Sequence, residues 1–190
     1  LVDSGPYKDV FKTELAEDSK SAGTWHTKEG GSYNAAGVGG AITGKGAHIF
    51  IIDDPYKNRE DAESEVWRDT VWNWYSSVVY TRLEEKGAII LIQTRWHGED
   101  LAGRLLAEGK DKWVHLNFPA IAEENEKFRK IGDPLWSKKY DREALERIRD
   151  NIGVYDWSAL YQQSPTNRES REFKENWLKY YEQDPYGLNV

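Results

Sequence analysis

The sequence predicts an α/β fold, with a mainly parallel sheet and helices on both of its faces. Two almost wholly apolar runs, residues 48–52 and 88–92, have the length and the β-branched composition of buried strands. Between them, residues 60–82 repeat apolar side chains at helical spacing. A strand, a long helix and a second strand are typical of a parallel βαβ unit, and strands that are apolar throughout are typical of sheets covered on both sides.

The first strand delivers two adjacent carboxylates, Asp53 and Asp54, and Pro55 ends it. Paired acids at the end of a buried strand are costly unless a cation or a reaction uses them. In nucleotide-hydrolysing motors, the first acid of such a pair holds Mg²⁺ through water and the next polarises the attacking water. The alternative is an ordinary turn, because Asp and Pro are common turn residues.

The second strand ends in three polar residues, Gln93, Thr94 and Arg95. Parallel strands end at the same edge of a sheet, so we expect these side chains to gather near Asp53 and Asp54. Open α/β sheets bind their ligands at that edge. Polar groups that end two neighbouring buried strands are harder to explain as turns than either group alone.

Periodicity and capping residues predict the other elements. Asn58 is the expected N-cap of helix 60–82, and residues 132–134 are the best candidate for a subdomain boundary. We expect a hairpin in residues 21–36, helices at 99–108, 141–151 and 155–163, and an alternating edge strand at 113–118. The spacing of four aromatic residues predicts a final amphipathic helix around Phe173, Trp177, Tyr180 and Tyr181.

Several segments resemble the large subunits of bacteriophage terminases, the ATPase motors that package DNA into capsids. The likeness runs through residues 37–47, 51–64, 72–75, 81–83, 94–105 and 157–165. It implies a P-loop NTPase-like fold that uses ATP and Mg²⁺. The function that it implies is ATP hydrolysis driving the translocation of double-stranded DNA into procapsids.

The resemblance also implies roles for the residues at the sheet edge. Asp53 would bind the metal and Asp54 would be the catalytic carboxylate. Thr94, with Gln93, would sense the γ-phosphate and couple its loss to DNA movement, although Thr94 could instead cap the helix that follows. Arg95 would contact phosphate, in its own subunit or a neighbouring one, or pair with an acid, either Asp100 or Asp54.

A phosphate-binding loop (Walker A) needs a glycine-rich turn that opens a helix, with Lys followed by Ser or Thr. Residues 39–46 imitate this spacing, but Gly46 occupies the hydroxyl position and the segment precedes a strand. By the resemblance, the true P-loop lies upstream and a nuclease domain lies downstream. We therefore expect residues 1–121 to be the C-terminal part of the ATPase core and residues 122–190 to be a helical linker. The fragment alone is expected to be inactive.

Composition restricts the partners. A net charge of −7 argues against a domain whose whole surface binds DNA, and no apolar run approaches the roughly twenty residues that span a membrane. The resemblance implies a phage or prophage protein in the host cytoplasm. Its partners would be double-stranded DNA, the terminase small subunit, the portal protein and further copies in a ring.

Two other functions stay open. A stand-alone metal-dependent hydrolase or nuclease would use Asp53, Asp54, His97 and Asp100. Such an enzyme needs a third or fourth acid near the same sheet edge, and only Asp100 and Glu99 are available. The last alternative is a catalytically silent fragment that serves as an interaction module.

Overall fold

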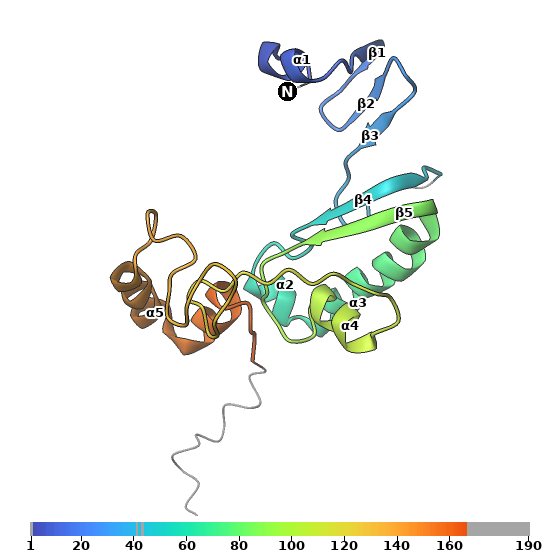
Figure 1. Cartoon of the computed structure of the whole chain (residues 1–190). Helices are drawn as coiled ribbons and strands as arrows, with labels where there is room; N and C mark the ends of the chain where they lie inside the picture. The colour runs from blue at the N-terminus through green and yellow to red at the C-terminus, as the bar shows by residue number, and fades with distance from the viewer. Residues whose placement is uncertain (1, 41, 43, 167–190) are drawn as a thin grey trace, which may run out of the picture. The chain divides into compact units, whose positions relative to one another are not determined.

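The computed structural model describes residues 2–40, 42 and 44–166 (Figure 1). The chain forms two compact units. The first contains Leu1–Pro55 and Asp69–Ile92, and the second contains Tyr56–Arg68 and Gln93–Val190. The final helix predicted around Phe173 lies outside the described residues.

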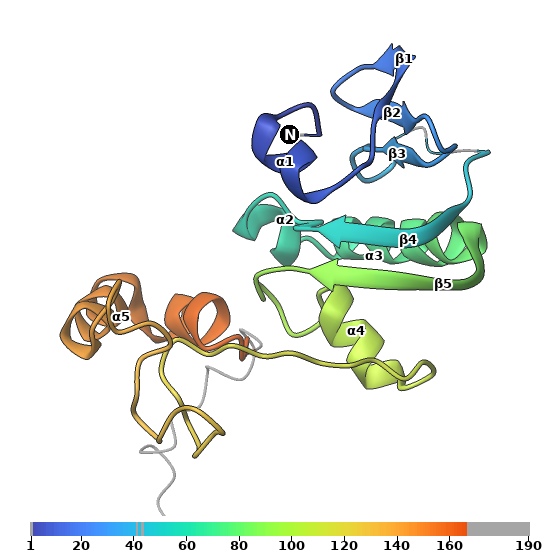
Figure 2. The same cartoon turned by 45° about the horizontal axis from the view of Figure 1, so that its top comes forward.

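The N-terminal part of the first unit holds a short helix and a three-stranded antiparallel sheet (Figure 2). The elements are α1 (Gly5–Val10), β1 (Leu15–Lys20), β2 (Thr24–Thr27) and β3 (Ser32–Asn34). Strands β2 and β3 confirm the hairpin predicted in residues 21–36, and the rings of Trp25 and Tyr33 stack across it at 5.0 Å. Strand β1 extends the sheet and was not predicted, because it lacks the apolar alternation of a half-buried strand.

The two apolar runs form the predicted parallel pair, β4 (Ala47–Asp53) and β5 (Leu83–Ile92). Their register places Ile51 opposite Ile90 and Asp53 opposite Ile92. Strand β5 begins five residues earlier than predicted, but its regular pairing with β4 is confined to the predicted apolar run, residues 88–92. The structure thus confirms a mixed α/β fold with a small parallel sheet.

The helix predicted over residues 60–82 is divided. Asn58 caps α2 (Arg59–Glu63) by accepting a hydrogen bond from the Asp61 N–H at 2.9 Å, as predicted. The backbone then leaves the helical region at Ser64, whose Oγ accepts from the Trp67 N–H at 3.3 Å. Ser64 therefore starts a new helix, as short hydroxyl side chains often do. This helix is α3 (Glu65–Trp74), and it continues as the π-helical turn η1 (Tyr75–Val79) and the 3-10 turn η2 (Tyr80–Arg82).

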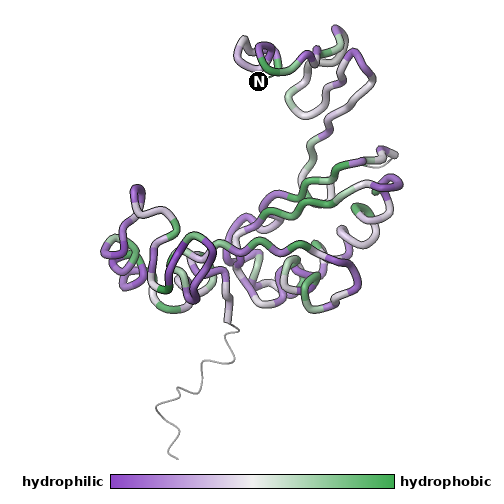
Figure 3. Tube along the Cα trace, in the orientation of Figure 1, coloured by the Kyte–Doolittle hydropathy of each residue, from purple (hydrophilic) through white to green (hydrophobic). Residues whose placement is uncertain are grey.

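Only one face of the β4–β5 sheet is covered by described residues of the first unit. On that face, Phe50 meets Trp74 edge to face at 6.2 Å, and the core comprises Ile52, Val71, Tyr75 and Val79. On the other face, Ile49, Ile51, Ile90 and Ile92 are 63%, 58%, 44% and 54% exposed. Figure 3 shows that both strands are hydrophobic where they pair with each other. The prediction of helices on both faces is therefore wrong for the described residues, because no element of this unit lies over the four isoleucines.

The second unit contains α4 (Leu101–Glu108), α5 (Arg142–Asp156) and the π-helical turn η3 (Trp157–Tyr161). Helix α4 confirms the helix predicted at 99–108. Gly153 has non-helical dihedral angles (φ 79°, ψ 166°), so α5 is kinked there, close to the division predicted between helices 141–151 and 155–163. The core of this unit comprises Ala62, Leu101, Leu105, Ala122, Leu145, Tyr155, Trp157 and Ala159.

The edge strand predicted at 113–118 does not form in the described part of the chain. The side chains expected to face a core, Val114, Leu116 and Phe118, are all exposed. Alternation shows which face of a strand would be apolar, but a strand also needs a neighbour for its backbone groups. No ladder reaches this segment.

The predicted boundary at residues 132–134 is a turn inside the second unit. After it, the chain returns to residues 120–122: the Ala122 N–H donates to the Asp133 carbonyl at 3.0 Å, and the Leu135 N–H donates to the Ala120 carbonyl at 2.8 Å. The division of function expected after residue 121 stays a prediction. Among the described residues, no helix is long and apolar enough to span a membrane.

Candidate functional site

Asp53 and Asp54 lie at the carboxyl edge of the parallel sheet, as the sequence predicts. Asp53 is the last residue of β4 and is exposed. The Asp54 N–H donates to the Ile92 carbonyl at 2.9 Å, which extends the pairing by one residue. Asp54 then turns into the left-handed region (φ 41°), before the buried Pro55. A non-glycine residue held at positive φ is a feature of functional turns, and Asp and Asn tolerate it best.

Gln93 directly follows β5, and its side-chain amide is buried without a hydrogen-bond partner among the described residues. Both polar atoms of this amide are shielded from solvent. Each unsatisfied buried group costs about 1–3 kcal/mol, so such groups are uncommon unless a ligand, a water or another segment binds them. The amide has one acceptor and two donors to offer such a partner.

Asp100 is fully buried, and its carboxylate holds the start of α4. The single N–H of the Arg95 Nε donates a bifurcated hydrogen bond to its two oxygens, at 3.0 and 2.9 Å. The backbone N–H groups of Trp96, His97 and Gly103 donate to it as well, at 3.2, 3.4 and 2.9 Å. A carboxylate with this many donors is satisfied inside the protein, so Asp100 is a structural residue that fixes the chain after β5.

Arg95 therefore pairs with Asp100, which is one of the partners that the sequence left open. Its side chain is only 14% exposed, and its backbone N–H donates to the Gln163 Oε1 at 3.1 Å. The contact with phosphate stays a prediction, and so does the sensing role of Thr94. Both residues belong to the second unit, as does Gln93.

Two titratable groups near Asp100 have shifted pKa values. Burial, with the nearby Arg68 guanidinium, lowers the pKa of His97. Its Nδ1 accepts the Glu99 N–H at 3.0 Å. Burial raises the pKa of Tyr56 to about 12, and the negative charge of Asp100 adds to the effect. Both shifts favour the neutral form of the side chain.

The alternative of a metal-dependent hydrolase gains no support. Among the described residues, no group of three or more His, Asp or Glu side chains lies where it could hold a metal ion. Of the four residues proposed for it, Asp100 is committed to Arg95 and to backbone donors. His97 uses its Nδ1 within its own loop.

Arg59 joins three segments of the second unit, and sequence reasoning missed it. Its guanidinium lies 5.3 Å from the centre of the Trp96 ring and 4.5 Å from that of Tyr155. It also forms ion pairs with Glu63 and Asp156. Cation–π contacts with two rings are stabilising where the cation is partly desolvated. No local pattern signals this cluster, because its members are far apart in sequence.

Gly103 is required by the close approach of α4 to the preceding loop. A Cβ atom at this position would lie 1.9 Å from the Gly98 carbonyl oxygen, and backbone cannot move aside as a flexible side chain can. We expect Gly103→Ala to lower the free energy of unfolding by about 3 kcal/mol, the upper end for overpacking. Denaturant unfolding of the 190-residue chain measures this. Gly5→Ala, in a helix with open space around it, should change stability by less than about 1 kcal/mol, and equal effects of the two variants would contradict the steric argument.

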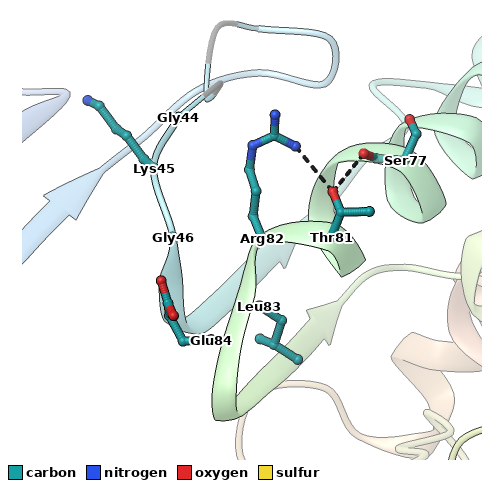
Figure 4. A pocket seen from close by; sticks show the side chains of 8 residues that line it. All are labelled: Gly44, Lys45, Gly46, Ser77, Thr81, Arg82, Leu83 and Glu84. Atoms are coloured by element: carbon teal, nitrogen blue, oxygen red, sulfur yellow. Dashed lines mark hydrogen bonds between the residues drawn. The ribbon is translucent and has the colours of Figure 1, made fainter.

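A surface pocket lies at the opposite end of the parallel sheet, where β4 and β5 begin. It is lined by Gly44, Lys45, Gly46, Ser77, Thr81, Arg82, Leu83 and Glu84 (Figure 4). The Arg82 guanidinium is held by the Val78 carbonyl at 3.0 Å, and Lys45 donates to Asn34 at 2.5 Å. Lys45 is followed by strand β4, whereas a P-loop lysine is followed by a helix. Because the pocket lies where the two strands begin, it is separate from the edge that carries Asp53 and Asp54, where they end.

Comparison with known proteins identifies the family. The family model described as "Terminase large subunit, T4likevirus-type, N-terminal" matches residues 8–180. A search of curated proteins and a search of solved structures gave no match. The match covers nearly the whole chain and agrees with the resemblance seen in the sequence, and this family indicates a role in phage DNA packaging. The chain therefore belongs to the family of T4likevirus-type terminase large subunits and matches the N-terminal part of that family.

Proposed function

We propose that this chain supplies the hydrolytic edge of a DNA-packaging ATPase, in which ATP hydrolysis drives double-stranded DNA into procapsids. The observation that carries the proposal is the position and conformation of the acid pair: Asp53 ends a parallel strand, and Asp54 follows at φ 41°. The family match supports packaging. In this proposal Asp54 polarises the water that attacks the γ-phosphate.

The donor set at this edge suits Mg²⁺. Magnesium is usually held by one or two carboxylates together with substrate phosphates and water, so it needs no larger cluster of protein ligands. The exposed Asp53 carboxylate can provide such a ligand. A bound Mg²⁺ would neutralise charge on the phosphates of ATP.

Gln93 and Thr94 are the proposed sensors of the γ-phosphate. Their position directly after β5 supports this, because β5 ends beside the acid pair in the register of the sheet. The unsatisfied amide of Gln93 supports it further, since a phosphate oxygen or the attacking water would give its buried donors a partner. Arg95 is proposed to support the loop, and to contact phosphate only if it leaves Asp100.

We also propose that the P-loop, the adenine site and the nuclease lie in other parts of the full-length protein. For the P-loop, the open face of four isoleucines supports this, because parallel sheets are normally covered on both sides. The small subunit, the portal protein and further copies in a ring are the proposed partners.

Thr94→Ala tests the coupling role in the full-length protein. A hydrogen bond to a charged group is worth about 1.5–3 kcal/mol, enough to shift a two-state loop more than tenfold. We expect the variant to keep its fold and its nucleotide affinity, and to lose DNA packaging. ATP binding and the packaging of DNA into empty procapsids are measured side by side.

Thr81→Ala is the matched control for this experiment. It removes a threonine hydroxyl from the first unit, at a position in η2 just before β5, where the Thr81 Oγ1 donates to the Ser77 carbonyl at 2.8 Å. Packaging by this variant should be near that of the wild type. Normal packaging by Thr94→Ala would show that Thr94 is only a helix cap, and the coupling assignment would be wrong.

A further inference from the structure

The loop that follows β5, residues 93–97, is attached to residues 142–163 of the second unit. These residues comprise α5, η3 and the two glutamines after η3, and we name them the C-terminal helical segment. We name residues 93–97 the coupling loop. The attachment is a hydrogen bond from the Arg95 backbone N–H to the Gln163 Oε1, at 3.1 Å, across 68 residues of sequence. Gln163 lies just beyond η3, in a stretch that the sequence singled out without giving it a role. The bond places the backbone next to Thr94 under the control of a distant side chain.

Gln163 is held in the orientation that this bond requires. Its Nε2 donates to the Leu160 carbonyl at 2.8 Å, which fixes the plane of the amide and leaves Oε1 for Arg95. Its backbone is in the left-handed region (φ 57°), which is sterically unfavourable for a non-glycine residue. Such a conformation persists only where surrounding contacts determine it.

The neighbouring Gln162 has a different partner, which separates the roles of the two glutamines. It is buried, and its amide binds both backbone groups of Ile121, each at 3.0 Å. Its Nε2 also donates to Glu123 at 2.8 Å. Gln162 thus fixes the segment around Ile121, and Gln163 fixes the coupling loop.

Arg59 provides a second attachment between the same two segments. Its guanidinium lies between the ring of Trp96, in the coupling loop, and the ring of Tyr155, in α5. It also pairs with Asp156 of that helix. The coupling loop is therefore attached to the C-terminal helical segment at two adjacent residues. Arg95 bonds directly through its backbone, and the Trp96 ring is joined to Tyr155 through Arg59.

We propose that Gln163 is a positioning residue that sets the conformation of the coupling loop, and that the C-terminal helical segment thereby controls Thr94. The proposal extends the proposed function, since its consequence for turnover depends on Thr94 acting at the nucleotide. Its structural part does not depend on that activity. Displacement of η3 would release the Arg95 N–H, and a change in the coupling loop would in turn be felt at Gln163 and η3.

Amide hydrogen exchange of the purified 190-residue chain, read by NMR, tests the structural part. Gln163→Ala should make the Arg95 amide exchange roughly three- to tenfold faster, the loss expected for one hydrogen bond. Gln163→Gly relieves the left-handed backbone but also lacks the acceptor, so it should show the same increase. Gln163→Glu keeps an oxygen acceptor for the Arg95 N–H but loses the Nε2 donor to the Leu160 carbonyl, so it should retain more protection than Gln163→Ala and less than the wild type.

Gln162→Ala is the matched control. It should expose the Ile121 amide and leave exchange at Arg95 unchanged. If Gln163→Gly restored protection at Arg95, backbone strain would explain the effect and the positioning role would be overturned. Unchanged exchange at Arg95 in all three Gln163 variants would overturn it as well.

Kinetics of the full-length protein test the functional consequence separately. Gln163→Ala should lower kcat for ATP several-fold with little change in KM, because the loop would be displaced while the nucleotide site stays intact. Gln163→Glu should restore part of the lost kcat, because it keeps the acceptor for the Arg95 N–H. Loss of amide protection with unchanged kcat would keep the attachment but overturn control of Thr94. Absence of ATP turnover in the wild type would instead refute the proposed function and leave the exchange result standing.

Discussion

Replacing Asp54 by Asn is expected to lower ATP turnover by the full-length protein about a hundredfold or more, while nucleotide binding stays near that of the wild type. Loss of a carboxylate that activates the attacking water has an effect of this size. Asn has the same shape as Asp and accepts positive φ equally well, so the turn at Asp54 should be preserved. Steady-state hydrolysis and equilibrium binding of ATP, measured on the same preparation, give the two quantities.

Asp150→Asn is the control for this substitution. It removes one negative charge from an exposed position of α5 and should leave turnover unchanged. Near-normal turnover by Asp54→Asn would contradict the catalytic assignment and favour the simple Asp-Asp-Pro turn. A loss of nucleotide binding equal to the loss of turnover would assign Asp54 to binding instead of catalysis.

Replacing Asp100 by Ala is expected to destabilise the 190-residue chain by about 3–5 kcal/mol, the cost of breaking a buried ion pair from one side. The change removes the N-cap of α4 and leaves the Arg95 guanidinium, only 14% exposed, without its carboxylate. The backbone N–H groups of Trp96 and His97 lose their acceptor too. Urea unfolding followed by circular dichroism measures the free energy of unfolding.

Asp141→Ala is the control that separates the contribution of the ion pair with Arg95 from that of the helix cap. Asp141 caps α5 in the same way, accepting from the Ala144 N–H at 2.8 Å, but it is exposed and has no arginine in the described structure. Its loss should cost only about 1 kcal/mol. A destabilisation by Asp100→Ala no larger than that of Asp141→Ala would show that the buried pair with Arg95 adds nothing. Asp100→Asn should fall between the two.

Local signals predicted a large part of the site. The acid pair, the strand that carries it and the cap at Asn58 depend on residues within a few positions of one another, and β-propensity and capping act over that range. The polar residues after β5 were located in the same way. The conformation of Asp54 was not predicted, although the following Pro55 indicated that the strand ends there.

The sequence by itself determined the βαβ order, the parallel pairing, the acids at the sheet edge and the family. Only the tertiary structure decided that Asp100 is a structural partner of Arg95, that Gln163 holds the coupling loop, and that residues 113–118 have no strand to pair with. These outcomes depend on contacts such as the one from Arg95 to Gln163, which spans 68 residues. Periodicity and composition report what a segment can bury or cap, but they carry no information about which distant segment will meet it.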